Sequence, residues 1–442
     1  MILIPTEAEY AINKLIKNGY DAYLVGGFVR NSLMGIDTTD CDITTSATPD
    51  EVINVFKDLK VVKTGIKHGT VTVIKNNIPL EITTFRIDEN YTDNRHPESV
   101  IFTKSIRDDL ARRDFTVNAL AYNKEKGLVD EFGGIDDIKN SVLRAVGNAA
   151  ERFNEDALRI MRAIRFSAVL GFEIEPKTKA AIFEFKDLLL NVSSERIFSE
   201  LVKLIMGKNA ADVICEYHEV LEVILPEIKG MAGFDQQAPH HIYDVLKHTA
   251  VALQKTEATK HLRLAVLLHD CGKPQCFSTD KNGVGHFKGH PELSAKKAKQ
   301  ALCRLKADNE TVLNVVRLIA HHDDAIPLTE AGVKRALNSL TVQGFFDLIK
   351  LKKADNLAKG DLAKFRLSEA ERLYEIGKKV IDENQCFSLK QLAIKGDDLI
   401  ALGIPRGKKL GDTLEALLDA VIDSRVENDK NKLIEYLKNH IA

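Results

Sequence analysis

The feature that most constrains this chain is a pair of adjacent glycines between a short apolar stretch and a helical pattern. Gly26 and Gly27 follow the apolar residues 22–25 and precede a helix expected over residues 28–34. Because glycine has no Cβ atom, its backbone can approach a phosphate closely, and the N-terminus of the next helix offers N–H donors. Arg30 lies in the first turn of that helix, where its guanidinium could hold a phosphate oxygen. The sequence therefore predicts a phosphate-binding turn.

Acidic residues on the following strands predict a metal site. Asp40 and Asp42 lie two residues apart on an expected strand, so both carboxylates point to one face. Glu81 lies on a later strand and could supply a third ligand. Crowded carboxylates are costly without a cation, and Mg²⁺ binds oxygen ligands. Each pattern alone is common in surface strands and turns, but their combination favours two-metal phosphoryl transfer.

The chain changes character after its first third. Residues 1–134 contain short stretches rich in Val, Ile and Thr, typical of strands, mixed with segments of helical spacing. From residue 155 onwards nearly every segment has an apolar period of 3.6 residues, so we expect an α/β domain followed by mostly helical domains. Asn76 and Asn77 predict a hairpin turn, and the polar residues 87–97 predict a mobile loop. Domains are expected over residues 1–145, 146–235, 236–360 and 361–442.

Charge and cysteine content limit the environment and the partners of the chain. The formal net charge is −2, so nucleic-acid binding must come from local basic clusters. The six cysteines form no C-x-x-C pair, which favours reduced thiols over a disulfide framework. The N-terminus lacks the pattern of a signal peptide, and no run approaches the ~20 apolar residues that span a bilayer. We therefore expect a cytoplasmic protein without a membrane partner.

Two further clusters combine arginines with acidic residues. Arg112, Arg113 and Asp114 are consecutive, and adjacent guanidinium groups suit contacts with phosphate and with a ribose hydroxyl. Asp156 and Arg159 lie three residues apart on an expected helix, so they share a face. A carboxylate accepts and a guanidinium donates hydrogen bonds, so this pair could match the Watson–Crick edge of a base.

Two more arginines extend the second cluster. Arg162 and Arg165 follow at three-residue spacing on the helix expected over residues 155–170, and they could line the path of the phosphates. An isolated Asp–Arg pair at this spacing is more often a solvated salt bridge worth ~0.3 kcal/mol. The functional interpretation therefore depends on the motifs around it.

The order of these motifs resembles the class II tRNA nucleotidyltransferases and their relatives, the bacterial poly(A) polymerases, within the superfamily that includes DNA polymerase β. Asn31 departs from the family pattern, which usually has Asp at this position; it is not a metal ligand. The resemblance implies a flexible motif C with Gly133 and Gly134 as a hinge, and a motif E in which Ser194 caps a helix and Arg196 braces the motif D helix. Motifs A to E correspond in order to residues 26–42, 112–120, 130–136, 155–159 and 194–196.

The resemblance implies a fold and an activity. The expected fold is a polymerase-β-like nucleotidyltransferase head, then a helical neck and body that select the nucleotide, an HD-type domain, and a helical tail that binds tRNA. The expected activity is template-independent addition of C, C and A to the 3′ end of tRNA from CTP and ATP, with Mg²⁺ held by Asp40 and Asp42. Motif B would engage the ribose and triphosphate, and Asp156 and Arg159 would read the incoming base.

The resemblance leaves several products open, because relatives add CCA, only CC, only A, or poly(A) tails. Residues 94–97 lie between motifs A and B, in a loop that CC-adding relatives shorten or lose. Residues 62–73 resemble the CCA-adding version rather than the basic segment of bacterial poly(A) polymerases. Both features favour full CCA addition, while addition of A alone stays open. An RNA-binding HD phosphodiesterase with an inactive head, or a non-enzymatic tRNA-binding protein, would leave three converging acids unexplained.

A histidine-rich block in the second half resembles the HD superfamily of metal-dependent phosphohydrolases. His248, His269, Asp270 and Asp355 have the order H…HD…D, and together they could hold a second divalent metal. Six or more ligands would allow a binuclear centre; the alternative is an inactive helical module that helps to hold tRNA. Further possible ligands are His286, His290, His321 and His322.

Affinity for a polyanion requires basic side chains. The segment 403–411 resembles the C-terminal tail of the family, which contacts the tRNA elbow. The candidates for RNA binding are Arg95 and His96 in the polar loop, Lys104, Arg107, and the tail residues Arg406, Lys408 and Lys409.

Overall fold

The computed structural model of the chain describes residues 2–39, 41–91, 97–239, 241–360 and 364–440. The chain forms two compact units, Met1–Pro226 and Glu227–Ala442, which are described separately. No helix in the described part of the chain is long and apolar enough to cross a membrane. The finer division into four domains stays a prediction.

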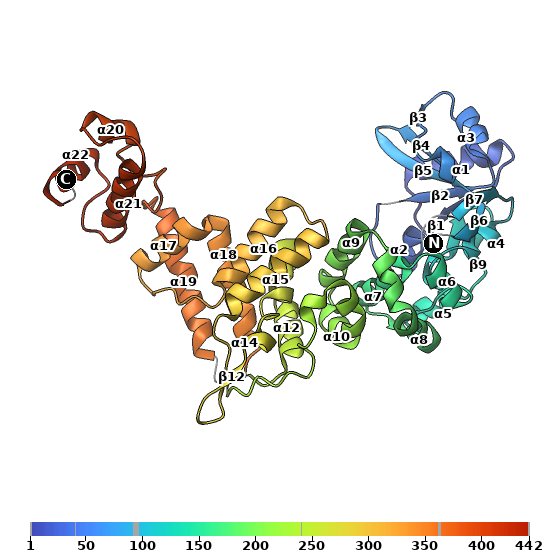
Figure 1. The fold of residues 1–442 in the computed structure, drawn as a ribbon. Helices are drawn as coiled ribbons and strands as arrows, with labels where there is room; N and C mark the ends of the chain where they lie inside the picture. Colours follow the sequence, from blue (N-terminus) through green and yellow to red (C-terminus); the bar gives the residue numbers. More distant parts are fainter. Residues whose placement is uncertain (1, 40, 92–96, 240, 361–363, 441–442) are drawn as a thin grey trace. The chain divides into compact units, whose positions relative to one another are not determined.

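A seven-stranded sheet organises the first unit (Figure 1), with the strand order β3-β4-β5-β2-β1-β8-β9. The pair β2–β5 is parallel, and the other neighbours in the sheet are antiparallel. The strands are β1 (Ala22–Val25), β2 (Asp42–Thr45), β3 (Lys60–Val62), β4 (Thr70–Lys75), β5 (Ile78–Thr84), β8 (Leu120–Asn123) and β9 (Gly127–Asp130).

Strand β1 is buried along its whole length because the sheet is covered on both faces. Leu24 belongs to a core formed with α1 (Thr6–Lys17) and α3 (Pro49–Val55). Its neighbours Tyr23 and Val25 point to the other face, where they join a smaller core with α4 (Ile106–Ala111). This alternation places β1, and the helix α2 (Gly27–Leu33) that follows it, at the centre of the unit.

Two turns test the expectations for the first unit. Asn76 and Asn77 have φ angles of 51° and 63° and connect the antiparallel strands β4 and β5, so the predicted hairpin turn is confirmed. The predicted loop is wrong at both ends, because β6 (Arg86–Tyr91) pairs with β7 (Pro97–Phe102). A two-stranded ribbon is held by main-chain hydrogen bonds, so polar composition does not exclude it. Arg95 and His96 lie outside the described residues.

The rest of the first unit is mainly helical. The helix expected over residues 155–170 is broken near its start, because Asp156 has an extended backbone with φ −137° and ψ 101°. The short strands β10 (Val142–Leu143) and β11 (Glu173–Ile174) pair in parallel. The helices are α5 (Gly134–Lys139), α6 (Ala149–Glu155), α7 (Leu158–Leu170), α8 (Pro176–Phe185), α9 (Ser194–Ile205), α10 (Ala210–Glu216) and α11 (His218–Ile224).

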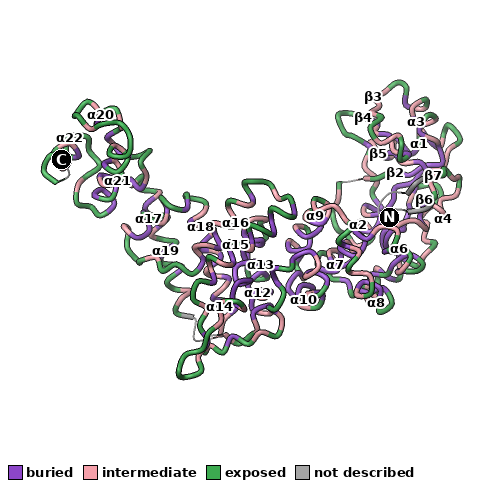
Figure 2. The backbone as a smooth tube through the Cα atoms, viewed as in Figure 1, coloured by how far each residue is buried: buried purple, intermediate pink, exposed green. Residues whose placement is uncertain are grey.

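In its described residues the second unit is mainly helical, with one small ribbon of β12 (Ser278–Thr279) and β13 (Gly285–His286). Helix α13 (Lys260–Leu268) is buried on all sides from Leu262 to Leu268, and Figure 2 shows it among buried segments. The last three helices share a core of their own. The helices are α12 (Val245–Gln254), α13 (Lys260–Leu268), α14 (Lys273–Cys276), α15 (His290–Arg304), α16 (Asn309–His321), α17 (Glu330–Leu340), α18 (Val342–Leu357), α19 (Lys364–Asp382), α20 (Gly396–Ala401), α21 (Lys408–Ile422) and α22 (Lys430–His440).

Candidate functional site

Two carboxylates lie next to each other on the parallel strands of the head sheet. Asp42 on β2 is the direct register partner of Glu81 on β5, and both residues are exposed. In-register residues of neighbouring parallel strands point to the same face, with the strands ~4.8 Å apart. The pair therefore fits oxygen ligation of Mg²⁺. Asp40 lies outside the described residues, so its place beside Asp42 stays a prediction.

The glycine turn brings guanidinium groups close to the backbone. Gly26 has φ 72° and ψ −130°, which side-chain-bearing residues rarely adopt, and its N–H donates to the Leu120 carbonyl at 3.0 Å. A Cβ atom at Gly26 would lie 3.1 Å from Nη1 of Arg113, and one at Gly27 would lie 3.7 Å from Nη2 of Arg30. The absence of side chains at the turn therefore leaves both arginines within reach of a ligand on its backbone.

Three guanidinium groups surround one aromatic ring beside this turn. The Cζ atoms of Arg30, Arg162 and Arg165 lie 5.1, 5.4 and 3.6 Å from the centroid of Phe166. Burial, together with the repulsion of Arg165 and Arg162, lowers the pKa of Arg30 to about 10, against the opposing effect of Asp114. Arg30 is still cationic at neutral pH. This arginine cluster (Arg30, Arg162 and Arg165) therefore suits a polyanionic ligand.

Acidic residues fix the arginines of motif B. Asp109 is fully buried and accepts hydrogen bonds from Nη2 of Arg112 at 2.8 Å, Nη2 of Arg113 at 3.3 Å and Oγ1 of Thr44 at 3.1 Å. Burial raises the pKa of Asp109, but the two arginines outweigh this and hold it below its ordinary value. Sequence reasoning missed Asp109, although its spacing of three and four residues from the arginines on a helix was a usable signal.

Asp114 connects motif B to the arginine cluster. Its carboxylate accepts from Nε of Arg162 at 2.7 Å and from Nδ2 of Asn118 at 2.9 Å. Burial opposes ionisation, but Arg162 and Asn118 lower the pKa of Asp114 to about 2. Asn118 also accepts from Nη1 of Arg30. One hydrogen-bonded network thus holds the residues predicted from two motifs.

Motif D differs from its prediction in geometry. Asp156 and Arg159 do not share one helical face, because the chain breaks between α6 and α7 and the Asp156 carboxylate accepts from the Leu158 N–H at 3.1 Å. Asp156 thereby caps α7, a use of Asp that competes with helix continuation. Nη1 of Arg159 donates to Glu155 at 2.6 Å, and its Nη2 donates to the Arg112 carbonyl at 2.9 Å. Arg159 therefore lies beside motif B.

Motif E agrees with one of its two predictions. Arg196 donates to Asp156 at 2.8 Å, so its bracing of motif D is confirmed. The predicted cap by Ser194 is wrong: helix α9 begins at Ser194, its N-cap is Ser193, and that side chain makes no capping hydrogen bond.

Motif C is packed rather than open. The Asp130 carboxylate accepts from the N–H groups of Gly134 and Ile135, each at 2.8 Å, and so caps α5. A Cβ atom at Gly134 would lie 2.3 Å from the Thr116 carbonyl oxygen, so this position requires glycine. Gly133 has φ 78°. The hinge role of the two glycines stays a prediction.

The second unit brings six predicted metal-ligand candidates together. One ligand atom from each of His248, His269, Asp270 and Asp355 lies within 4.8 Å of the others, and Asp270, His290 and His322 form a second such group. Asp270 belongs to both groups, with Oδ2 3.2 Å from Nε2 of His269 and Oδ1 3.4 Å from Nε2 of His290. We call these six residues the histidine cluster.

Main-chain hydrogen bonds orient the rings of this cluster. Nδ1 of His269, His290 and His322 each lies 2.7–2.8 Å from the carbonyl oxygen three residues earlier in the chain. A carbonyl can only accept, so each Nδ1 carries the proton and each Nε2 turns toward the cluster as a metal ligand would. Nε2 of His290 lies 3.1 Å from Nε2 of His322, a pairing of lone pairs that a shared cation would relieve.

The charges of the cluster also favour a cation. Nε2 of His269 is buried and makes no well-aligned hydrogen bond to the described residues, although Oδ2 of Asp270 lies 3.2 Å away. Burial lowers the pKa of His269, but Asp270 and Asp355 outweigh it and raise the pKa to about 9. The carboxylates of the buried Asp270 and the partly buried Asp355 thus hold positive charge at this place, as a proton or as a metal ion. The donor set of imidazoles and carboxylates fits a divalent transition metal.

Two other predicted histidines lie apart from the cluster, and two lysines join it unexpectedly. His286 interacts with Asp280 at 3.2 Å, and His321 interacts with Asp324 at 2.6 Å. Lys273 lies 2.7 Å from the Asp270 carboxylate. Lys359 is bonded to Asp355. These lysines carried no sequence signal, because their partners are set by the fold. A cavity of about 560 Å³ opens at this place, lined by both lysines and by cluster residues.

The basic residues of the tail are exposed. Arg406 precedes α21, and Lys408 and Lys409 begin it. Their exposure is compatible with contacts to a polyanion. RNA binding by these residues stays a prediction.

Three protein-family models match parts of this chain. The poly A polymerase head domain matches residues 22–144, the probable RNA and SrmB-binding site of polymerase A matches residues 171–231, and a putative tRNA nucleotidyltransferase domain 2 matches residues 289–437. The head, which matches the poly A polymerase head domain, and its site therefore define a nucleotidyltransferase.

Full-length relatives narrow this class. A CCA-adding enzyme of Geobacillus stearothermophilus is 34% identical over 434 residues, covering 98% of this chain and 96% of that protein. One of Lactobacillus delbrueckii subsp. bulgaricus is 34% identical over 435 residues, 98% of this chain and 97% of that one. The chain therefore belongs to the family of CCA-adding enzymes. Its fold matches the crystal structure of the Bacillus stearothermophilus CCA-adding enzyme in complex with CTP, with a TM-score of 0.74 and 29% identity over 99% of this chain and 98% of that one.

Proposed function

We propose that this protein adds C, C and A to the 3′ end of tRNA, from CTP and ATP, in the cytoplasm and without a template. The observation that carries the proposal is the place of the arginine cluster beside the glycine turn. Relatives of the chain are CCA-adding enzymes, and one solved relative is a complex with CTP. A poly(A) polymerase or an enzyme that adds only A is the alternative that product analysis would reveal.

The roles of the head residues follow from their chemistry. Gly26, Gly27 and Arg30 bind the triphosphate, and Arg112 and Arg113 bind the ribose and phosphates, while Asp109 holds both arginines in place. Arg162 and Arg165 add positive charge along the phosphates. Asp114 orients Arg162.

The acidic residues of the sheet would bind the metal ions. Asp42 and Glu81, with Asp40, would hold two Mg²⁺ ions, which would polarise the attacking 3′-hydroxyl and stabilise the departing pyrophosphate. The chain itself fixes the spacing, because the parallel register places Asp42 and Glu81 on one face.

Selection of the base belongs to motif D. Asp156 is held by Arg196, and Arg159 is held by Glu155 and by the main chain of motif B. Both side chains are therefore fixed before a nucleotide arrives, which suits a site that reads bases by hydrogen bonds. An incoming C or A would offer its Watson–Crick edge to these two side chains.

Three tRNA transcripts test this proposal: one lacking the terminal CCA, one ending in CC and one ending in CCA. Each is incubated with the purified protein, Mg²⁺ and labelled CTP, ATP or both. Stepwise extension to CCA followed by a stop is the expected result. Addition of A alone to the transcript ending in CC would identify an A-adding enzyme, and long A tails would identify a poly(A) polymerase.

The orientation of the histidine rings favours a second activity. We propose that the histidine cluster holds two divalent metal ions, with Asp270 shared between them, and hydrolyses phosphoesters at RNA or nucleotide ends. The ions would act as Lewis acids on the phosphoryl group. Water attacks phosphorus, the P–O bond to the ribose breaks, and the departing oxygen takes up a proton. Lys273 and Lys359 hold the two carboxylates in place.

Metal analysis and a generic substrate test this second activity. The purified protein should retain divalent metal after dialysis and hydrolyse bis(p-nitrophenyl) phosphate with added Mn²⁺ or Ni²⁺. His269→Ala should lose both properties. Hydrolysis that persists in this variant would refute the assignment.

A further inference from the structure

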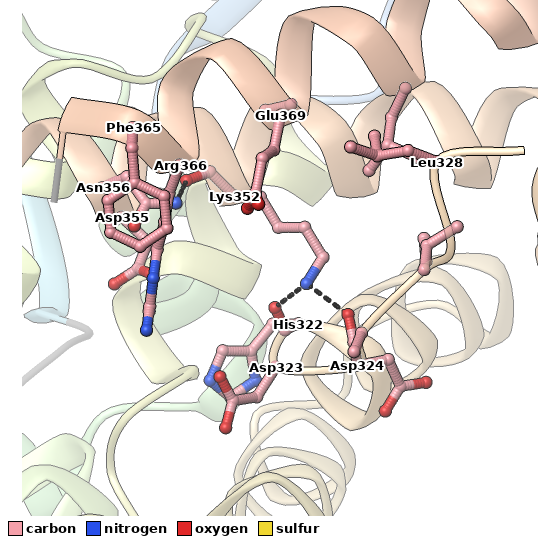
Figure 3. Close-up of a pocket in the computed structure, with 14 residues that line it drawn as sticks. His322, Asp323, Asp324, Leu328, Lys352, Asp355, Asn356, Phe365, Arg366 and Glu369 are labelled. Atoms are coloured by element: carbon pink, nitrogen blue, oxygen red, sulfur yellow. Dashed lines mark hydrogen bonds between the residues drawn. The ribbon is translucent and has the colours of Figure 1, made fainter.

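A second cavity of about 400 Å³ adjoins the histidine cluster (Figure 3). It lies among the end of α16, the loop after it, α18 and α19. It meets the cavity described above, because the two share lining residues, among them the cluster members His322 and Asp355 as well as Arg366. A ligand could therefore occupy both cavities at once, and its connecting part would pass Arg366.

One wall of the second cavity is apolar and open. Phe365 is 56% exposed and Leu328 is 38% exposed, and both line the cavity. Leu373 and Ile326 extend this apolar lining. Cζ of Arg366 lies 5.7 Å from the centroid of the Phe365 ring. An exposed ring beside a guanidinium offers a flat surface on which a nucleobase can stack.

The cavity contains a buried hydrogen-bond acceptor. Asn356 is 9% exposed, and its Oδ1 is buried without a hydrogen-bond partner among the described residues. Its Nδ2 donates to the Lys352 carbonyl at 2.8 Å, which fixes the orientation of the amide, because a carbonyl can only accept. Leaving a buried acceptor unpaired is costly. A ligand that donates an N–H group here would remove that cost.

The other polar side chains do not satisfy Asn356. Nζ of Lys352 is used by the carbonyl oxygens of His322 and Asp324, at 2.7 and 2.8 Å, as the dashed lines of Figure 3 show. Asp323 and Glu369 also line the cavity and offer only acceptors when ionised. The lining therefore favours a ligand with amino groups over one with carbonyl groups at this edge.

We propose that this cavity is a nucleobase subsite of the histidine-cluster centre, which binds a base with an exocyclic amino group, such as adenine or cytosine. The base stacks on Phe365 and its amino group donates to Oδ1 of Asn356. Arg366 lies where the two cavities meet and neutralises the phosphate that reaches the cluster. This inference rests on the proposed phosphohydrolase activity and narrows its substrate from phosphoesters at RNA or nucleotide ends to those whose base carries an exocyclic amino group.

Catalysis provides the first test, with the full-length, metal-loaded protein. Substrates are adenosine 2′,3′-cyclic phosphate, uridine 2′,3′-cyclic phosphate and bis(p-nitrophenyl) phosphate, which has no base. We expect kcat/KM to be about tenfold higher for the adenosine than for the uridine substrate, and Asn356→Leu to remove this preference. Phe365→Ala should lower the ratio of kcat/KM for the adenosine substrate to that for bis(p-nitrophenyl) phosphate by about five- to tenfold. Leu357→Ala removes an apolar side chain that is 48% exposed on α18 and serves as the matched control.

Binding provides the second test, independent of hydrolysis. Adenosine 2′-phosphate is titrated by calorimetry into chelator-treated protein, and CTP is left out because its cytosine would compete for the subsite. Phe365→Ala should weaken binding about fivefold or more, whereas Leu357→Ala should match the wild type. Equal binding by both variants would overturn the subsite, even if hydrolysis is observed. If bis(p-nitrophenyl) phosphate is not hydrolysed, the proposed phosphohydrolase activity fails, and the binding comparison still decides on the subsite.

Discussion

The arginine cluster of the first unit and the histidine cluster of the second differ in the sign of the charge that they leave to a ligand. In the first, three guanidinium groups gather on Phe166, and burial lowers the pKa of Arg30 to about 10. In the second, imidazole lone pairs and two carboxylates converge, and the pKa of His269 is raised to about 9. The first site is suited to an anion such as a triphosphate and the second to cations.

The carboxylates of the two units also differ in exposure. Asp42 and Glu81 are exposed on the sheet, whereas Asp270 is 1% exposed. Metal ions at the sheet would arrive and leave with a nucleotide, whereas metal ions held by the proposed site in the histidine cluster would be enclosed by protein. We therefore expect exchangeable Mg²⁺ in the first unit and resident metal in the second. The following predictions test this comparison.

The largest effect is expected from the acidic edge of the sheet. Asp42→Ala should reduce nucleotide addition by about a thousandfold or more, because the Mg²⁺ ions that would contact the attacking and departing oxygens lose a protein ligand. Addition is measured by incorporation of labelled CTP and ATP, and tRNA binding is measured in parallel and should stay nearly intact. Asp37→Ala, at an exposed acid of the loop that precedes β2, is the control. Appreciable turnover of Asp42→Ala would refute the assignment.

Loss of an imidazole ring from the histidine cluster should affect metal binding in the second unit but not nucleotide addition by the first. His269→Ala should reduce the metal retained after dialysis by about ten- to a hundredfold, while Mg²⁺-dependent nucleotide addition continues. Mass spectrometry of the dialysed protein measures the metal. His286→Ala changes a histidine outside the cluster and should retain the wild-type metal content. A joint loss of metal and addition would contradict the separation.

Base selection should depend on motif D. Arg159→Ala should reduce the discrimination between correct and incorrect nucleotides by about ten- to a hundredfold, because a hydrogen-bonding site left incomplete loses its preference. The measurement compares kcat/KM for CTP and ATP on the transcripts that lack CCA or end in CC. Preserved discrimination would overturn the proposed role of Arg159.

The smallest effect concerns stability. The pKa of Asp114 is lowered to about 2, so its ionised form stabilises the fold above its unfolded pKa, and this contribution disappears as the pH falls toward 2. Asp114→Asn should lower the free energy of unfolding by about 2 kcal/mol at neutral pH. Urea unfolding should show the difference from wild type narrowing below pH 4. The exposed Asp136→Asn should show no comparable difference, and a constant Asp114→Asn difference across pH would contradict the argument.

The sequence allowed prediction of features with local causes. The turn at Gly26 and the hairpin at Asn76 depend on residues adjacent in the chain, and both lie where expected. The break at Asp156 was missed because the apolar period continues across it, while the capping carboxylate makes an alternative local structure. Polar composition likewise concealed the β6–β7 ribbon.

Prediction of the two sites was limited because their residues come from distant parts of the chain. Four histidines were equivalent candidates in sequence, and only the packing of α15 and α16 against α13 brings His290 and His322 to Asp270, leaving His286 and His321 outside. The pairing of Asp42 with Glu81 depends on a parallel register between strands far apart in the chain. The sequence named Glu81 as a candidate ligand, but its register with Asp42 and the sorting of the histidines are set by tertiary packing, which no local pattern reveals.

The buried carboxylate of Asp109 has a consequence for how the head tolerates change. It bonds at once to Thr44, two residues beyond Asp42 on β2, and to Arg112 and Arg113. It thus fixes the distance between the metal-binding strand and the phosphate-binding arginines. A substitution at Asp109 would displace both the metal-binding strand and the phosphate-binding arginines, so metal affinity and triphosphate affinity would change together.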